Sequence, residues 1–218
     1  MVTKLSDLGF SKGDIAETVV STYNKEGKPN AAPMGVIMQG EKHLSIDFFN
    51  STSTYKNINL NKCAVVNLTN DVEIFYKTAF KEANPKGKLP EEWFEKANSV
   101  NAPKLKLAEA TIDVSLKNMT PLDQEKTKAA FNLERLDAKT VYPQVYSRAM
   151  ALTIEAIIHA THVEAFIKNE ETEQEHVGKL LELIENYNGT VNRVAPNSIY
   201  SNVMSDLMKR IESWRNSK

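Results

Sequence analysis

The stretch at residues 17–35, ETVVSTYNKEGKPNAAPMG, decides how we interpret the rest of the chain. Its first part alternates β-branched and polar residues up to Tyr23, which is typical of a strand. Residues 25–29 then supply charges, a Gly that tolerates positive φ and a Pro that stops strand pairing. The stretch therefore predicts two strands joined by a tight turn.

The second of these strands carries the run Asn-Ala-Ala-Pro-Met-Gly. Because Pro33 has no N–H to donate, it indicates an edge position or a bulge and not a central ladder position. Gly35, two residues later, leaves space for a ligand to approach the backbone. Two interpretations stay open: an ordinary bulged edge strand, or a strand whose free N–H groups bind a ligand.

Composition limits the class of protein. With 218 residues, 41% of them hydrophobic and 25% charged, the chain resembles a soluble globular protein of one large domain, or of a medium domain with a small appendage. The net charge of -1 gives no general attraction to nucleic acid or acidic membranes. No apolar run approaches the roughly 20 residues of a membrane span, and no signal peptide is evident. Cys63 has no second cysteine to pair with, so the chain has no intrachain disulfide. Together these features lead us to expect a cytoplasmic protein without nucleic-acid or membrane partners.

The first two thirds of the chain predict strands, and the last third predicts helices. Besides the hairpin, further strands are expected at 43–49, 63–68, 107–117 and 126–141, with a turn at 118–123, a short helix at 55–60 and a strand or helix at 72–80. Helical stripes are expected at 149–158, 177–187 (ended by Asn188-Gly189) and 199–214. We therefore expect an α+β protein with a barrel or sandwich of six to seven strands in 1–142 and a helical region in 143–218 packed on it.

Residues 81–104 form a long connection with three prolines. A short helix is expected from Pro90, with Trp93 and Phe94 on its apolar side. A connection of this length is commonly a lid or a binding loop. The alternative is a surface excursion that its aromatic residues fix to the core, and both interpretations remain open.

The run Ser-Thr-Ser-Thr-Tyr-Lys-Asn at 51–57 is the most informative polar cluster. Free N–H groups at a helix start, the positive end of the helix dipole and Lys56 would together suit a phosphate monoester. The alternative is a simple Ser/Thr N-cap next to a solvated Lys56. Four hydroxyl groups, where capping needs one, favour the phosphate site.

The first helical stripe contains a possible metal set and a possible anion-binding residue. Glu155, His159 and His162 lie at helical spacing, but no second carboxylate–His pair accompanies them, so we expect no metal. Arg148 could bind a phosphate or carboxylate bidentately, or form an ion pair with one of the many Glu residues. Motifs of common hydrolases, nucleoside-triphosphatases and dinucleotide-binding enzymes are absent from the sequence.

Four segments carry a resemblance to a known family. They are ETVVSTYNKEGKPNAAPMGV (17–36), STSTYKNI (51–58), CAVVNLT (63–69) and YSRAMALTIEAIIHAT (146–161). Together they resemble the archaeal flavoproteins of unknown function in the FMN-binding split-barrel superfamily. The similarity runs from about Ile15 to the last helix, and its most specific parts are the PNAAPMG run and the hydroxyl-rich run.

The resemblance implies a split β-barrel that forms a homodimer and holds FMN near the subunit interface. The backbone of Ala32, Pro33, Met34 and Gly35 would run along the isoalloxazine ring. The resemblance places the phosphate or the ribityl chain at a second group of residues, namely Ser53, Thr54, Lys56 and Asn57. By analogy with flavin reductases Asn67 would face the same pocket, and Arg148 would assist from the helical region.

The resemblance also limits what can be said of the reaction, because no catalytic acid or base can be transferred from the family. It implies an FMN-dependent oxidoreductase that acts on an unidentified small substrate with a small-molecule electron donor or acceptor. The alternatives are a non-catalytic FMN carrier or redox sensor, and a deazaflavin-dependent reductase.

Overall fold

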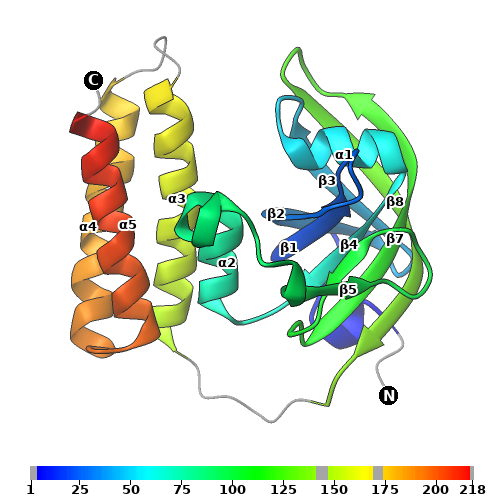
Figure 1. Ribbon diagram of the computed structural model, residues 1–218, viewed down its shortest axis with the longest axis horizontal. Helices are drawn as coiled ribbons and strands as arrows, with labels where there is room; N and C mark the ends of the chain where they lie inside the picture. The colour runs from blue at the N-terminus through cyan, green and yellow to red at the C-terminus, as the bar shows by residue number, and fades with distance from the viewer. Residues whose placement is uncertain (1–3, 141–146, 169–173, 217–218) are drawn as a thin grey trace. The chain divides into compact units, whose positions relative to one another are not determined.

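The computed structural model describes residues 4–140, 147–168 and 174–216 (Figure 1). It divides into two compact units. The barrel unit comprises Met1–Thr69 and Lys81–Tyr142, and the helical unit comprises Asn70–Phe80 and Pro143–Lys218. The expected boundary between 142 and 143 lies outside the described residues. The division otherwise differs from the expected one in residues 70–80, which group with the helices.

Six antiparallel strands close into a barrel in the order β1-β2-β3-β8-β7-β4. Their bounds are β1 Ile15–Tyr23, β2 Pro29–Gly40, β3 His43–Phe49, β4 Cys63–Leu68, β7 Ala110–Pro121 and β8 Lys126–Ala138. β1 pairs with both β2 and β4, which closes the ring. The predicted α+β class and strand number are confirmed, although β7 continues to Pro121, so the turn before β8 comes later than expected.

The barrel is filled from one side of each strand, as the alternation of its residues predicts. The buried core includes Val20, Val36, Met38, Leu44, Ile46, Phe48, Ala64, Val66, Ile112, Val114, Ala129 and Phe131. The predicted short helix is α1 (Ser53–Asn61), and its Ile58 is fully buried in the same core. Each fully buried aliphatic or aromatic side chain of this kind stabilises the fold by about 1.5–3 kcal/mol.

β2 changes its strand partners along its length. Residues 29–37 pair with β1, whereas pairing with β3 begins only at Val36. Within the described chain, residues 29–35 thus have a strand neighbour on one side alone, and we call them the open half of β2. Pro33 lies in this half, opposite Val19. The predicted edge position is confirmed, while the irregularity in the ladder lies between Met38 and Gly40.

The helical unit contains α2 (Val72–Ala79), α3 (Arg148–Lys168), α4 (Gln174–Val194) and α5 (Ile199–Asn216). Residues 72–79 form a helix because Asp71 caps them by accepting from the N–H groups of Glu73 and Ile74. The Tyr76 hydroxyl donates to Asp206 of α5, which ties α2 to the helices. The predicted end of α4 at Asn188-Gly189 is wrong, because the helix continues through buried Val191.

α3 is more apolar than the sequence interpretation allowed. Over Arg148–Ile167 its mean hydropathy is 1.3, so by length and composition it passes the test for a membrane span. The expectation that no segment does so is wrong, because scattered polar residues such as Thr153 and His159 interrupt the run without lowering its mean enough. Core helices pass the same test, and α3 packs against α2, α4 and α5 through a fully buried face that includes Ala156 and Ala160.

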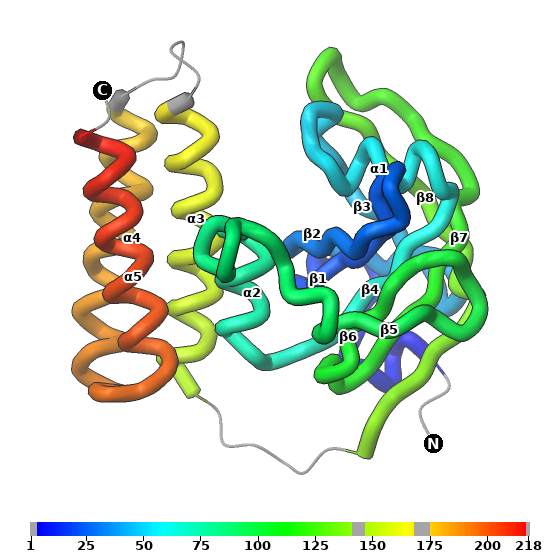
Figure 2. The backbone as a smooth tube through the Cα atoms, viewed as in Figure 1, coloured from blue at the N-terminus to red at the C-terminus, as the bar shows by residue number. Residues whose placement is uncertain are grey.

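The second half of the long connection is fixed to the barrel wall (Figure 2). The expected helix after Pro90 is only a single 3-10 turn, Glu91–Trp93, followed by the hairpin of β5 (Phe94–Lys96) and β6 (Pro103–Leu105). Ser21 Oγ donates to the Pro103 carbonyl at 2.5 Å, and the Ser99 N–H donates to Asp113 Oδ2 at 2.8 Å. Residues 94–105 are therefore an anchored excursion, which was one of the two open interpretations.

Asn67 makes several of the hydrogen bonds that hold this excursion to the barrel. Its Nδ2 donates to the Val19 carbonyl and to Ser21 Oγ, both at 2.8 Å, and to the Val65 carbonyl at 3.2 Å. Its Oδ1 accepts from the Leu105 N–H at 2.8 Å. One fully buried amide thus joins β1, β4 and β6.

We expect Asn67→Ala to destabilise the protein by about 2–4 kcal/mol, because it leaves a buried N–H and buried carbonyl groups without partners. Urea unfolding measures this loss. Asn118→Ala, on an exposed position of β7, is the matched control and should change the free energy of unfolding by about 0.5 kcal/mol or less. Equal effects of the two substitutions would contradict the role assigned to Asn67.

Candidate functional site

α1 is attached to the end of the first hairpin by two amides one helical turn apart. Asn57 Nδ2 donates to Thr22 Oγ1 at 3.0 Å, and Asn61 Nδ2 donates to the Tyr23 carbonyl at 2.7 Å. Thr22 is in turn the cross-strand partner of Asn30, the second residue of β2. The hydroxyl-rich run and the start of the open half of β2 are therefore brought together, as the sequence interpretation requires.

The hydroxyl-rich run divides into capping residues and available residues. Thr52 is the N-cap of α1, since its Oγ1 accepts from the Tyr55 N–H at 3.3 Å. The alternative of simple capping therefore holds for Thr52. Ser53 and Lys56 are exposed, whereas Thr54 and Asn57 are buried, and the Asn57 amide is already committed to Thr22. Ser53 and Lys56 are thus the members of the predicted phosphate group that solvent reaches most freely.

The predicted ring-contacting residues occupy the open half of β2. Ala32, Pro33, Met34 and Gly35 are all partly exposed. Thr18 Oγ1 donates to the Met34 carbonyl at 3.1 Å, which uses one acceptor of this stretch. A Cβ added at Gly35 would lie 2.7 Å from Ile15 Cγ2, so the absent side chain makes room for a neighbouring strand residue. The predicted space for a ligand above Gly35 is filled, at least at that face, by the protein itself.

A contact that sequence reasoning missed, between buried Asn30 and half-buried Lys81, lies at the start of the open half. The Lys81 ammonium donates to Asn30 Oδ1, and burial lowers the pKa of this ammonium below its usual range. Asn30 is only 8% exposed, and its Nδ2 is buried without a hydrogen-bond partner in the described structure. Asn30 stands within the quoted PNAAPMG run, which was a signal, but nothing in the sequence around Lys81 indicates its contact with Asn30.

Two of the predicted residues have other surroundings. The Asn67 amide is saturated by its four hydrogen bonds within the barrel unit, so its geometry gives it a structural role. Arg148 is the exposed first residue of α3 in the helical unit. Its role in cofactor binding stays a prediction.

The histidines of α3 take part in aromatic contacts. His159 stacks on Tyr187 with ring centroids 5.9 Å apart, and His162 packs against Phe166 at 6.3 Å. Among residues 4–140, 147–168 and 174–216, no group of three or more His, Cys, Asp or Glu side chains is arranged to hold a metal ion. The arrangement therefore offers no support for a site at Glu155, His159 and His162.

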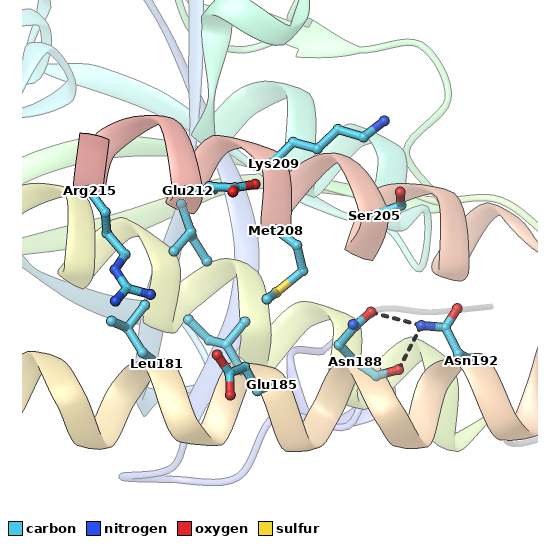
Figure 3. A pocket seen from close by; sticks show the side chains of 11 residues that line it. Leu181, Glu185, Asn188, Asn192, Ser205, Met208, Lys209, Glu212 and Arg215 are labelled. Atoms are coloured by element: carbon cyan, nitrogen blue, oxygen red, sulfur yellow. Dashed lines mark hydrogen bonds between the residues drawn. The ribbon is translucent and has the colours of Figure 1, made fainter. Parts of the chain in front are cut away.

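A groove with a volume of about 520 Å³ lies between α4 and α5 in the helical unit. Its floor is apolar and its rim charged, and Figure 3 shows Leu181 and Met208 directed into the space between the two helices. Both signs of charge are present, for example Glu185 and Arg215. None of the predicted cofactor residues lines it, and its mixed rim selects no particular ligand.

Comparisons with known proteins concern the family and the fold of the chain. Residues 16–142 match the family model described as the N-terminal domain of a protein of unknown function, DUF447. The chain belongs to the DUF447 family. The match covers β1 to the end of β8, the whole barrel with its open half of β2 and α1.

Solved structures extend the comparison beyond the family model. An FMN-bound DUF447 protein from Methanosarcina mazei is 25% identical, with a TM-score of 0.75 over 95% of this chain and 99% of that chain. A split-barrel protein from Shewanella frigidimarina, described as a candidate flavin reductase, is 16% identical with a TM-score of 0.50 over 60% of this chain and 70% of that chain. The second likeness shows the fold alone. The DUF447 match confirms the predicted family, and the second likeness confirms the predicted split-barrel fold.

Asp113 gives the anchored excursion a pH dependence. Burial raises the pKa of its carboxyl, and the Ser99 N–H only partly opposes this. The folded state therefore binds the proton more tightly than the unfolded state, so the contribution of Asp113 to stability falls as the pH rises through the folded pKa. Asp113→Asn removes this dependence while keeping an acceptor for Ser99.

We expect the free energy of unfolding of Asp113→Asn, relative to that of the unchanged protein, to increase as the pH rises above about 4, the ordinary aspartate range. Urea unfolding at several pH values up to neutral measures the difference. Asp123→Asn is the control, because Asp123 is exposed and also accepts backbone N–H groups. A difference that stays constant or shrinks with rising pH would rule out the raised pKa.

Proposed function

We propose that this DUF447 protein binds FMN along the open half of β2, with the phosphate at the start of α1. The observation that carries the proposal is the one-sided pairing of residues 29–35, held next to α1 by the Asn57–Thr22 hydrogen bond. The FMN-bound relative from Methanosarcina mazei, which matches over 95% of the chain, supports it.

The residues present fit such a cofactor. A strand without a second neighbour has backbone groups available to the polar edge of a planar ring. Ser53 and Lys56 are exposed in the first turn of α1, where N–H groups and the helix dipole favour a phosphate. Thr54 and Asn57 line the buried side of the same turns. Arg148 remains a further proposed contact.

We further propose an oxidoreductase that acts on a small substrate through the bound flavin, with a small-molecule electron donor or acceptor. The flavin supplies hydride or electron transfer, and the protein binds and orients it. A non-catalytic carrier or redox sensor, and a deazaflavin-dependent reductase, are the alternatives.

We also propose that the protein is a cytoplasmic homodimer with the flavin near the subunit interface. The support is α3, whose apolar window has only 28% of its residues buried within the chain. A second copy would cover such a face. Light scattering of the purified protein should give twice the 24.5 kDa of one chain. A monomer at micromolar concentration would contradict this part of the proposal.

FMN binding is tested directly on the purified protein. We expect a yellow protein that releases FMN on denaturation, and a ligand-free form whose melting temperature rises when FMN is added. A colourless protein that FMN does not stabilise would refute the proposal.

The double substitution Ser53→Ala and Lys56→Ala should weaken FMN binding about tenfold or more, because it removes a hydroxyl and a charge from the proposed phosphate site. Titration with FMN measures this. Lys117→Ala, which removes an exposed charge from β7, is the control and should leave the affinity unchanged. Unchanged affinity in the double variant would refute the assignment of the phosphate to α1.

The proposed activity is tested on the FMN-loaded protein under anaerobic conditions. Nicotinamide and deazaflavin donors are added in turn, and bleaching of the flavin absorbance is followed with and without an acceptor. Repeated turnover supports the oxidoreductase. Reduction without turnover by any donor and acceptor pair favours the carrier or sensor.

A further inference from the structure

Asn30, which is buried, and Lys81, which is half-buried, carry more hydrogen-bond donors than they have acceptors in the described structure. Lys81 Nζ donates to Asn30 Oδ1, which is the one hydrogen bond of this ammonium in the described structure. Asn30 Nδ2 has no hydrogen-bond partner, although the residue is more than nine-tenths buried. An ammonium carries three N–H donors and an amide two, so most of the donors of this pair are unused.

The charge of Lys81 also favours an acceptor from outside the described residues. No carboxylate within the described ranges forms an ion pair with Lys81, whereas Lys77 and Lys104, which are also only partly exposed, both have one. Burial alone lowers the pKa of Lys81. Buried polar groups in native proteins almost always have partners, and buried charges are normally paired. The buried Asn30 Nδ2 therefore lacks an acceptor, and the neighbouring ammonium of Lys81 would favour an anionic one.

The position of the pair connects it to the proposed cofactor site. Asn30 is the second residue of the open half of β2. Its cross-strand partner Thr22 accepts a hydrogen bond from Asn57 of α1. Lys81 is the first residue of the long connection, where Asn84 Nδ2 donates to its carbonyl and closes the turn. Three separate segments of the barrel unit thus meet at Asn30.

We propose that Asn30 and Lys81 together bind an anionic, acceptor-only group of the ligand that lies along the open half of β2. This inference rests on the proposed function and adds two residues to that site. FMN offers two groups that fit, its anionic phosphate and the edge of its ring formed by N1 and the C2 carbonyl, which only accepts and on which negative charge builds when the flavin is reduced. In either case the first turn of the long connection acts as part of the binding site, while residues 94–105 anchor it.

Lys81→Met tests the charge. We expect FMN affinity to fall about ten- to a hundredfold, the loss typical of a hydrogen bond to a charged group. Lys88→Met, at an exposed position of the same connection, is the control and should bind FMN as the unchanged protein does. Riboflavin, which lacks the phosphate, distinguishes the two groups of the ligand. If the pair binds the phosphate, Lys81→Met leaves the affinity for riboflavin unchanged. If the pair binds the ring edge, Lys81→Met lowers the affinity for riboflavin as much as that for FMN.

Asn30→Asp separates ligand binding from a purely structural role. The new carboxylate would pair with Lys81, so the melting temperature without ligand should be kept or raised. The same carboxylate repels an anionic group, so FMN affinity should fall at least about tenfold. Because this variant gains an internal partner, it also covers the case in which Lys81→Met fails to fold.

The outcomes separate the two proposals. FMN affinities of both variants within about twofold of the unchanged protein would overturn the inference and leave the proposed function standing. Failure of the unchanged protein to bind FMN would overturn both. Loss of FMN affinity in both variants, with normal binding by Lys88→Met, is the result that the inference predicts.

Discussion

The arrangement of the barrel unit depends on one constraint: β2 has a single strand neighbour over residues 29–35 and gains the second only from Val36. Pro33 fits this half because it has no N–H to offer a second neighbour. The chain that follows β3 forms α1, which packs on β1, β2 and β4. The candidate site is the consequence of this incomplete pairing.

Two buried asparagines show how the same side chain can serve the fold or remain available. Asn67 uses its amide four times, and every bond joins elements of the barrel unit. Asn30 accepts one bond from Lys81 and leaves its Nδ2 unused. Saturation identifies the first as structural, since an added ligand would have to displace an existing partner. The unused donor of the second is the feature that suits a ligand.

Strand alternation and turn residues predicted the barrel and its edge at Pro33, and helical stripes predicted the three long helices, because these signals are local. The predictions failed where tertiary packing decides. Gly189 stays inside α4 because Val191 is buried beyond it, and α2 is a helix although its periodicity was undecided. For the site, the hydroxyl-rich run was visible in the sequence. The contact between Lys81 and Asn30 was not, because the two residues are 51 positions apart in the chain.

The central claim is that a flavin lies along the open half of β2, and amide hydrogen exchange with and without FMN tests it most directly. The account predicts slower exchange on FMN addition in peptides that cover residues 29–35, 53–57 and 81–84. Exchange in peptides from α4, at 174–194, should not change on FMN addition. Both samples are measured at the same protein concentration, so that the extent of dimer formation is matched. Unchanged exchange at 29–35, with FMN shown to be bound, would contradict the account.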